Sequence, residues 1–312
     1  MGSERDKFGP DAELSTFTQD ELLAHFDACV DAGVIKFDYN FITRVHTIDG
    51  IDFEFRISKA LQSKPHETSS PLATTLSTTS VAPRPGSDLR TAGTEIASLG
   101  KTHFLAFNGF ACYRPHYLML TTDGYRRQWE PLDIDDFTAV HALLDSDVTG
   151  SKSGKGEYLI FFNGGPDAGC SRVHKHLQAI PQESYGGDPW KNMDKGVLPF
   201  AYFEHRFGLD GERFGPGATL KAYNKGMEAV ARSIGAPAVA DGERARAPAH
   251  TVLMDRERIV VIARPKSGTG GVAANAAGML GMIWTSDEAS TQRWLDAGPE
   301  KVLKVAGVPK LA

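Results

Sequence analysis

The chain has 312 residues, of which 41% are hydrophobic and 23% are charged, and it carries a net charge of −5 at pH 7. These values are ordinary for a globular protein with a substantial buried core, organised as one large domain or two smaller ones. The negative balance argues against a general nucleic-acid-binding protein, because such proteins carry a basic surface. It is compatible with a local basic pocket for a nucleotide.

Cysteine usage and the chain's hydropathy indicate the compartment. Cys29, Cys112 and Cys170 are far apart and show no C-x-x-C spacing, and an odd, sparse count is typical of a reducing compartment. The first residues are charged and lack the apolar core of a signal peptide. No apolar run approaches transmembrane length. We therefore expect a cytoplasmic protein, with the nucleus as a second compatible location, and no membrane partner.

The N-terminal third predicts one helix, a group of strands and a long loop. Thr18 and Glu21 have the spacing of a capping box, apolar residues follow at helical intervals, and Gly33 is placed to end the helix. Residues 37–57 contain alternating apolar positions, which predict strands. From about residue 62 to 94 the composition shifts to Ser, Thr and Pro, which predicts a flexible loop.

The middle of the chain predicts a strand pair, a helix and a further strand. His103–Asn108 and Tyr117–Thr121 resemble the two strands of a hairpin. A helix follows, opened by Asp133 or Asp135. Glu157–Phe162 is a short apolar run that predicts a strand.

The C-terminal part predicts the clearest helix and a second hairpin. Apolar residues alternate at spacings of three and four between Thr219, a plausible N-cap, and Gly235, a plausible stop. Thr251–Met254 and Ile259–Ala263 flank a charged turn and predict paired strands. Strand pairs interrupted by helices, without regular βαβ alternation, favour an α+β fold with a mainly antiparallel sheet.

The most informative stretch is residues 163–178, where a turn-rich Gly/Pro segment leads directly into His-x-His-x-Gln. In an extended strand His174, His176 and Gln178 would all point to the same face. Two imidazoles and an amide would then lie beside a loop that can present backbone N–H groups to an anion. This combination suits chemistry on a phosphate.

This stretch resembles the active-site motif of the histidine-triad superfamily, and more narrowly that of fungal-type diadenosine tetraphosphate (Ap4A) phosphorylases, also called ATP adenylyltransferases. The resemblance extends to residues 60–65, 104–121, 250–265 and 275–282. It implies an N-terminal histidine-triad-like domain over residues 1–185, with a mainly antiparallel sheet flanked by helices and a flexible loop at about 62–94. It also implies a C-terminal ATP adenylyltransferase domain, residues 186–312, packed on the first.

The resemblance assigns His176 as the nucleophile, His174 as the residue that orients it, and Gln178 as a donor to a phosphate oxygen. The chemistry is consistent with these residue types. A neutral imidazole, with an ordinary pKa near 6.5, can attack phosphorus and form a covalent intermediate. Superfamily hydrolases generally place a third histidine where this chain has Gln178. The resemblance therefore implies transfer to phosphate and not to water, so that Ap4A and phosphate give ATP and ADP.

The same resemblance suggests further contacts to the substrate. Some residues would donate to the phosphates and others would contact the nucleotide or carry positive charge, whereas His116 and His250 are expected to be structural. The expected substrate-binding residues are Lys64, Asn108, Asn163, Gly165, Ser171, Arg264 and Lys266.

The implied ligands are small molecules: diadenosine polyphosphate, ATP, ADP and phosphate. A divalent cation such as Mg²⁺ is expected to accompany the polyphosphate, because metal ions neutralise charge in phosphoryl-type transfers. We expect no organic cofactor, no dedicated metal site on the protein, no nucleic-acid partner, and a monomer.

Three alternatives stay open at this level. Two histidines on one strand face can ligate zinc, although Cys170 is the only nearby candidate for a third ligand. Sugar-phosphate nucleotidylyltransferases also use His-x-His-x-Gln, but they typically carry proline at the position of Lys175. A nucleotide-binding sensor with slow turnover is the third alternative.

Overall fold

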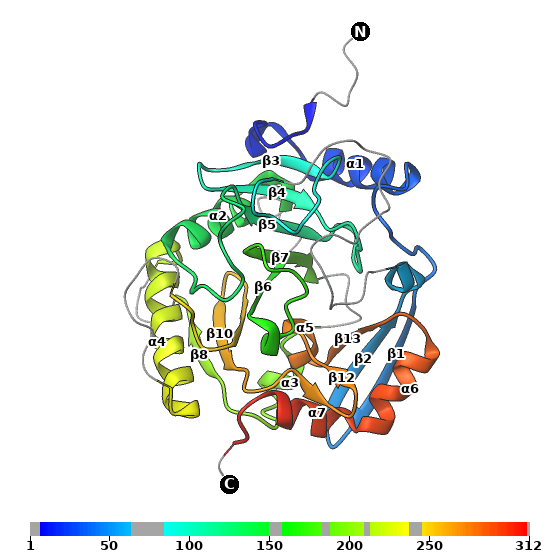
Figure 1. The fold of residues 1–312 in the computed structure, drawn as a ribbon, viewed down its shortest axis with the longest axis vertical. Helices are drawn as coiled ribbons and strands as arrows, with labels where there is room; N and C mark the ends of the chain where they lie inside the picture. The colour runs from blue at the N-terminus through cyan, green and yellow to red at the C-terminus, as the bar shows by residue number, and fades with distance from the viewer. Residues whose placement is uncertain are drawn as a thin grey trace.

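The computed structural model describes residues 7–63, 84–149, 158–182, 188–208, 213–236 and 245–310. Strands and helices alternate irregularly along the chain (Figure 1). The strands are β1 (Ile42–Ile48), β2 (Ile51–Ile57), β3 (Glu95–Leu99), β4 (His103–Phe107), β5 (Tyr117–Thr121), β6 (Tyr158–Gly164), β7 (His176–Pro181), β8 (Phe203–Arg206), β9 (His250–Met254), β10 (Arg258–Ala263), β11 (Gly268–Thr269), β12 (Val272–Ala273) and β13 (Met282–Thr285). The helices are α1 (Gln19–Asp31), α2 (Ile134–Leu144), α3 (Lys191–Asp194), α4 (Pro216–Ile234), α5 (Ala276–Met279), α6 (Glu288–Ala297) and α7 (Pro299–Ala306).

An eight-stranded sheet organises the molecule, in the order β3-β4-β5-β7-β6-β9-β10-β8. Each pair of neighbours in it runs antiparallel, so the predicted α+β fold with a mainly antiparallel sheet is confirmed. β6 pairs with β9, with Gly164 opposite His250. The strands that follow the expected domain boundary at residues 185 and 186 therefore extend the same sheet as the strands that precede it.

A smaller sheet has the order β1-β2-β13. β1 and β2 form an antiparallel hairpin, and β13 runs parallel to β2 with Met282 opposite Glu54. The C-terminal region thus contributes a strand to an N-terminal hairpin. In Figure 1 this sheet lies beside α6, apart from the strands β3 to β5.

The two largest hydrophobic clusters lie on the two faces of the large sheet. One is filled by β-strand residues such as Leu177 and Ala179 together with the apolar stripes of α1, α2 and α4. The other contains Phe161 and Ile180 of the large sheet and residues of the small sheet, α5 and α7. Because side chains alternate along a strand, His176 and Gln178 share the face of Ile180.

The helix ends follow the expected capping rules with one correction. Thr18 and Glu21 form the predicted capping box, and Asp133 forms another at the start of α2. α4, however, begins at Pro216 and not after Thr219. Proline is well suited to the first helical position, because its fixed φ matches the helix and its missing N–H is not needed there. Thr219 lies inside the helix and donates its hydroxyl hydrogen to the carbonyl of Gly215.

The stretch expected to be a flexible loop, at about residues 62–94, is described only at residues 62–63 and 84–94. Within the second part, Asp88 accepts hydrogen bonds from the backbone N–H groups of Val173 and His174. Residues that follow the Ser/Thr-rich segment therefore contact the motif directly. In the described parts of the chain, no helix is long and apolar enough to span a membrane.

Candidate active site

The main chain of His176, the first residue of β7, is held by the side chain of Gln128. The N–H of His176 donates to Gln128 Oε1 at 2.8 Å, and Gln128 Nε2 donates to the carbonyl oxygen of His176 at 2.9 Å. Gln128 is fully buried, so its amide takes the place of a neighbouring strand. This pairing fixes the backbone from which the imidazole projects.

The imidazole of His176 has a defined tautomer when it is neutral. Its Nδ1 lies 2.7 Å from the carbonyl oxygen of His174, and a carbonyl can only accept a hydrogen bond. The ring proton therefore belongs on Nδ1, and the lone pair belongs on Nε2. Nε2 is the atom of His176 that can act as a nucleophile.

His174 lies just before β7, in an isolated bridge with Arg127, which corrects the prediction that one strand carries both histidines and Gln178. Its Nε2 lies 3.0 Å from the carbonyl oxygen of Thr121, and its Nδ1 lies 2.8 Å from the hydroxyl of Ser87. Burial, with a smaller contribution from nearby His176, lowers the pKa of His174 to about 4. His174 is thus neutral at pH 7, and it orients His176 through its backbone carbonyl.

Buried neutral histidines predict that the protein loses stability in mild acid. Burial lowers the pKa of His141, His174 and His250 to about 4 each, whereas the same residues titrate near 6.5 when unfolded. Between pH 6.5 and 4 the unfolded state binds more protons, so the free energy of unfolding falls as the pH is lowered through that window. Urea unfolding at intervals from pH 7.5 to 4.5 measures this slope.

His141→Leu removes one of these titrating groups and should flatten the slope. An unfolding free energy that stays constant between pH 7.5 and 4.5 in the unaltered protein would contradict the burial of these histidines. His141 is a suitable choice because it lies on α2, where its Nε2 contacts the hydroxyl of Thr219, and not in the motif.

Gln178 lies on β7 two residues after His176, and its Oε1 is 2.9 Å from His116 Nε2. Sequence reasoning assigned His116 only a structural role, but the structure places it in direct contact with the motif. Asn108 lies next to them: its Oδ1 accepts from the N–H of Phe110 at 3.0 Å, and its Nδ2 is 3.3 Å from His116 Nε2. Asn108, an expected nucleotide contact, is thus placed as a turn residue beside the Gln178 side chain.

The glycine-rich loop is held against the C-terminal region. Asn163 is 4% exposed, and its Oδ1 accepts the N–H of Ala276 at 2.7 Å. Gly165 has a φ of +99°, which favours glycine, and its carbonyl accepts the N–H groups of Ala168 and Cys170. The loop conformation thus depends on residues on both sides of the expected domain boundary.

Arg264, an expected phosphate contact, is buried and hydrogen-bonded within the protein. It is 1% exposed, and its five N–H donors are all used within the protein. The acceptors are the carbonyls of Ala168, Ser267, Ala274 and Ala306 and the hydroxyl of Thr251. Burial lowers its pKa to about 9, so it remains charged at pH 7. The structure assigns Arg264 to bracing the loop that contains Ala168.

The three remaining expected phosphate contacts are Lys266, Ser171 and Lys64. Lys266 is exposed and follows β10. The last residue of β10, Ala263, pairs with His250, and His250 pairs with Gly164, so these residues lie at one end of the sheet. Ser171 is half-buried in the loop before His174. Lys64 lies outside the described residues. Lys266 and Ser171 therefore lie in segments at the same sheet end as His176.

Lys175 points to the opposite face from His176 and is fully buried. Its Nζ lies 2.5 Å from Asp136 Oδ2 and donates to the carbonyl of Pro131 at 2.8 Å, while His103 Nε2 lies 3.1 Å from Asp136 Oδ1. This cluster ties the residue between the two histidines to α2. Lys175 therefore positions the motif from behind and has no access to a phosphate on the other face.

The two motif histidines are poorly arranged as zinc ligands. Both ring nitrogens of His174 are engaged by Ser87 and Thr121, and Nδ1 of His176 is bonded to a carbonyl. Within the described ranges, no group of three or more His, Cys, Asp or Glu side chains is close enough to hold a metal ion.

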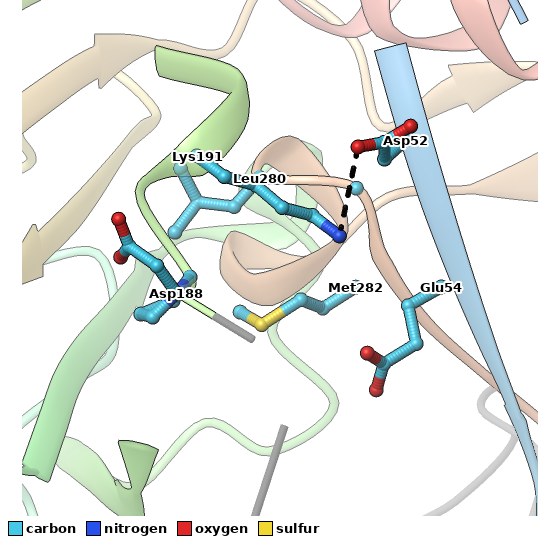
Figure 2. Close-up of a pocket in the computed structure, with 8 residues that line it drawn as sticks. Asp52, Glu54, Asp188, Lys191, Leu280 and Met282 are labelled. Carbon is cyan, nitrogen blue, oxygen red and sulfur yellow. Dashed lines mark ion pairs between the residues drawn. The ribbon is translucent and has the colours of Figure 1, made fainter. Parts of the chain in front are cut away.

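A small pocket opens between β2, β13 and α3 (Figure 2). Its charged lining is mainly acidic, and Lys191 is paired with Asp52 at 3.8 Å. A polyphosphate would be repelled there, so the pocket is unsuited to the phosphate chain of a nucleotide. The lining residues are Asp52, Glu54, Asp188, Pro189, Lys191, Leu280, Gly281 and Met282.

Two family models match the chain and together cover most of it. Residues 23–189 match the Ap4A phosphorylase N-terminal domain, and residues 196–309 match the ATP adenylyltransferase C-terminal domain. The chain belongs to the Ap4A phosphorylase/ATP adenylyltransferase family. It is thus a nucleotidyltransferase by family, as the motif predicted. No curated protein sequence matches the chain.

Solved structures of the family share this fold. Yeast Ap4A phosphorylase Apa2 is similar with a TM-score of 0.73 and 18% identity, over 94% of this chain and 98% of that chain. Apa2 in complex with Ap4A gives a TM-score of 0.68 at 18% identity, over 94% and 98% of the two chains. Apa2 in complex with AMP gives 0.69 at 18% identity, over 97% and 99%. At this identity the likeness establishes the fold.

Proposed function

We propose that the protein is a phosphorolytic Ap4A phosphorylase that forms an adenylylated histidine at His176. The observation that carries the proposal is the bond from His176 Nδ1 to the carbonyl of His174, which places the lone pair on Nε2. Gln178 lies two residues after His176 on β7, so its side chain projects from the same face of the sheet. The family assignment and the nucleotide complexes of Apa2 support Ap4A as the substrate and AMP as the transferred group.

The first half-reaction forms a covalent intermediate. Nε2 of His176 attacks an α-phosphorus of Ap4A, an N–P bond forms, and the P–O bond to the rest of the molecule breaks, so that ATP leaves. The Nδ1–H bond to the His174 carbonyl stabilises the positive charge that develops on the ring. The fixed backbone of His176, held by Gln128, keeps the nucleophile in place.

The second half-reaction restores the enzyme. A phosphate oxygen attacks the phosphorus of the adenylyl group, the N–P bond breaks, ADP leaves, and Nε2 recovers its lone pair. An amide N–H of Gln178 donates to a phosphate oxygen and so stabilises the negative charge of the transition state. Because an amide cannot exchange a proton as an imidazole can, Gln178 does not activate water. This difference supports transfer to phosphate.

The polyphosphate is expected to bring its own divalent cation, such as Mg²⁺, which would neutralise part of its charge. Lys266 is an exposed cation at the sheet end of the motif, and Lys64 is proposed as a second phosphate contact. Ser171 and the backbone of Gly165 are proposed as further donors to the same phosphates. The ligands are then small nucleotides and phosphate, and no organic cofactor takes part.

The test is to incubate the pure protein with Ap4A and Mg²⁺, with and without phosphate, and to separate the products. ADP should form only when phosphate is present, and without phosphate the ATP released should not exceed one equivalent of enzyme. Gln178→His, which places a third imidazole in the motif, should increase the release of AMP by water. Production of mainly AMP by the unaltered protein without phosphate would make it a hydrolase. Binding of Ap4A without turnover would make it a nucleotide sensor.

A further inference from the structure

His116 joins a turn in the chain to the side chain of Gln178. It precedes β5, is 1% exposed, and is surrounded by the rings of Tyr113, Phe161 and Trp284, with centroids 6.4, 6.3 and 5.7 Å away. Its two ring nitrogens face different groups: Nδ1 faces the backbone N–H of Cys112 at 3.4 Å, and Nε2 faces Gln178 Oε1 at 2.9 Å. The packed rings hold the imidazole in this orientation.

These contacts determine where the proton of His116 lies. A backbone N–H can only donate, so Nδ1 accepts from Cys112 and the neutral ring carries its proton on Nε2. Nε2 then donates to Gln178 Oε1 at 2.9 Å. Asn108 Nδ2 is farther away, at 3.3 Å, and it is itself a donor because Oδ1 of Asn108 accepts from Phe110. The short contact to Gln178 is thus the hydrogen bond of Nε2.

The orientation of the Gln178 amide has a direct consequence for the proposed reaction. When Oε1 accepts from His116, the NH₂ group of Gln178 is the end that can face the substrate. A reversed amide would present its oxygen to an anionic phosphate and would repel it. We propose that His116 is a positioning residue that sets the amide orientation of Gln178, and this proposal rests on the function proposed above.

A double-mutant cycle between His116 and Gln178 tests the proposal. His116→Leu and Gln178→Ala should each lower kcat for ATP formation from Ap4A by about 10- to 100-fold, because a misplaced donor loses most of its effect in the transition state. The double variant should be no slower than the slower single variant, since His116 acts only through Gln178. His116→Gln keeps an N–H donor and should recover most of the activity. Thermal unfolding confirms that each variant is folded.

His141→Leu is the matched control, because it also removes a buried histidine, but one on α2 that contacts Thr219. Combined with Gln178→Ala, its effect on kcat should be the product of the two single effects. If the effects of His116→Leu and Gln178→Ala on kcat also multiply, or if His116→Gln recovers no activity, the positioning role is overturned. When the enzyme does convert Ap4A and phosphate to ATP and ADP, such a result refutes this proposal and leaves the proposed function standing.

If the unaltered protein does not convert Ap4A, the proposed function fails. The double-mutant cycle is then measured with the affinity of each variant for AMP, determined by calorimetry. Coupling between His116 and Gln178 in AMP binding would still support the positioning role, because a donor set by His116 would face the phosphate of AMP as well. Additive effects on AMP affinity, or an AMP affinity that neither substitution changes, would refute it.

Discussion

His176→Ala should lower the rate of ATP formation from Ap4A and phosphate by about 10⁴-fold or more, the scale on which enzymes that act through a covalent intermediate lose activity when the nucleophile is removed. The rest of the site cannot replace it, because both ring nitrogens of neighbouring His174 are already engaged by Ser87 and Thr121. The fold should be retained, since Gln128 holds the main chain of residue 176 and not its ring.

Mass spectrometry of enzyme incubated with Ap4A in the absence of phosphate checks the assignment. The intermediate should carry a single AMP on the peptide that contains residue 176, and His176→Ala should carry none. His174→Ala is the informative comparison, because it should weaken the anchoring to Ser87 and Thr121 but leave the nucleophile in place. An adduct on His174, or unchanged turnover in His176→Ala, would show that the roles of the two histidines are reversed.

The features of the fold that were predictable from sequence are local ones. The capping box of Thr18 and Glu21 involves residues three apart, and the antiparallel strands β4 and β5 are consecutive in the chain, separated only by residues 108–116. Such signals depend on neighbouring residues alone. The parallel pairing of β2 with β13 joins residues near 54 to residues near 282, and no periodic pattern indicates which distant strand will be the partner.

The same division applies to the site. His176 and Gln178 are two residues apart, so their motif is visible in the sequence, and the structure places both on β7. The residues that orient them come from far along the chain: Gln128 lies 48 residues from His176, and His116 lies 62 residues from Gln178. Arg264 shows the converse: the resemblance suggested a phosphate contact, whereas the structure buries this residue and its donors are hydrogen-bonded within the protein.

Lys175→Met should destabilise the protein by about 3–5 kcal/mol, because it leaves a carboxylate buried without its cation. Lys175 Nζ lies 2.5 Å from Asp136 Oδ2, with the two side chains 0% and 1% exposed. Burial alone would raise the pKa of Asp136, but Lys175 and His103 outweigh it and hold that pKa well below its usual range. The stability of the motif region therefore depends on both partners of the Lys175–Asp136 ion pair.

Urea unfolding at pH 7 measures the loss, and a second substitution separates charge from packing. Combining Lys175→Met with Asp136→Asn should recover a large part of the stability, because the amide is neutral and can still accept the N–H of Asp133, which now bonds Asp136 at 2.8 Å. Lys301→Met, at an exposed position of α7, should change the free energy of unfolding by less than about 0.5 kcal/mol. If the double variant is less stable than Lys175→Met, the cost arises from lost packing around Lys175 and not from an unpaired buried carboxylate. Lys175 would then stabilise the motif by packing alone, and its ion pair with Asp136 would contribute little on the face opposite His176.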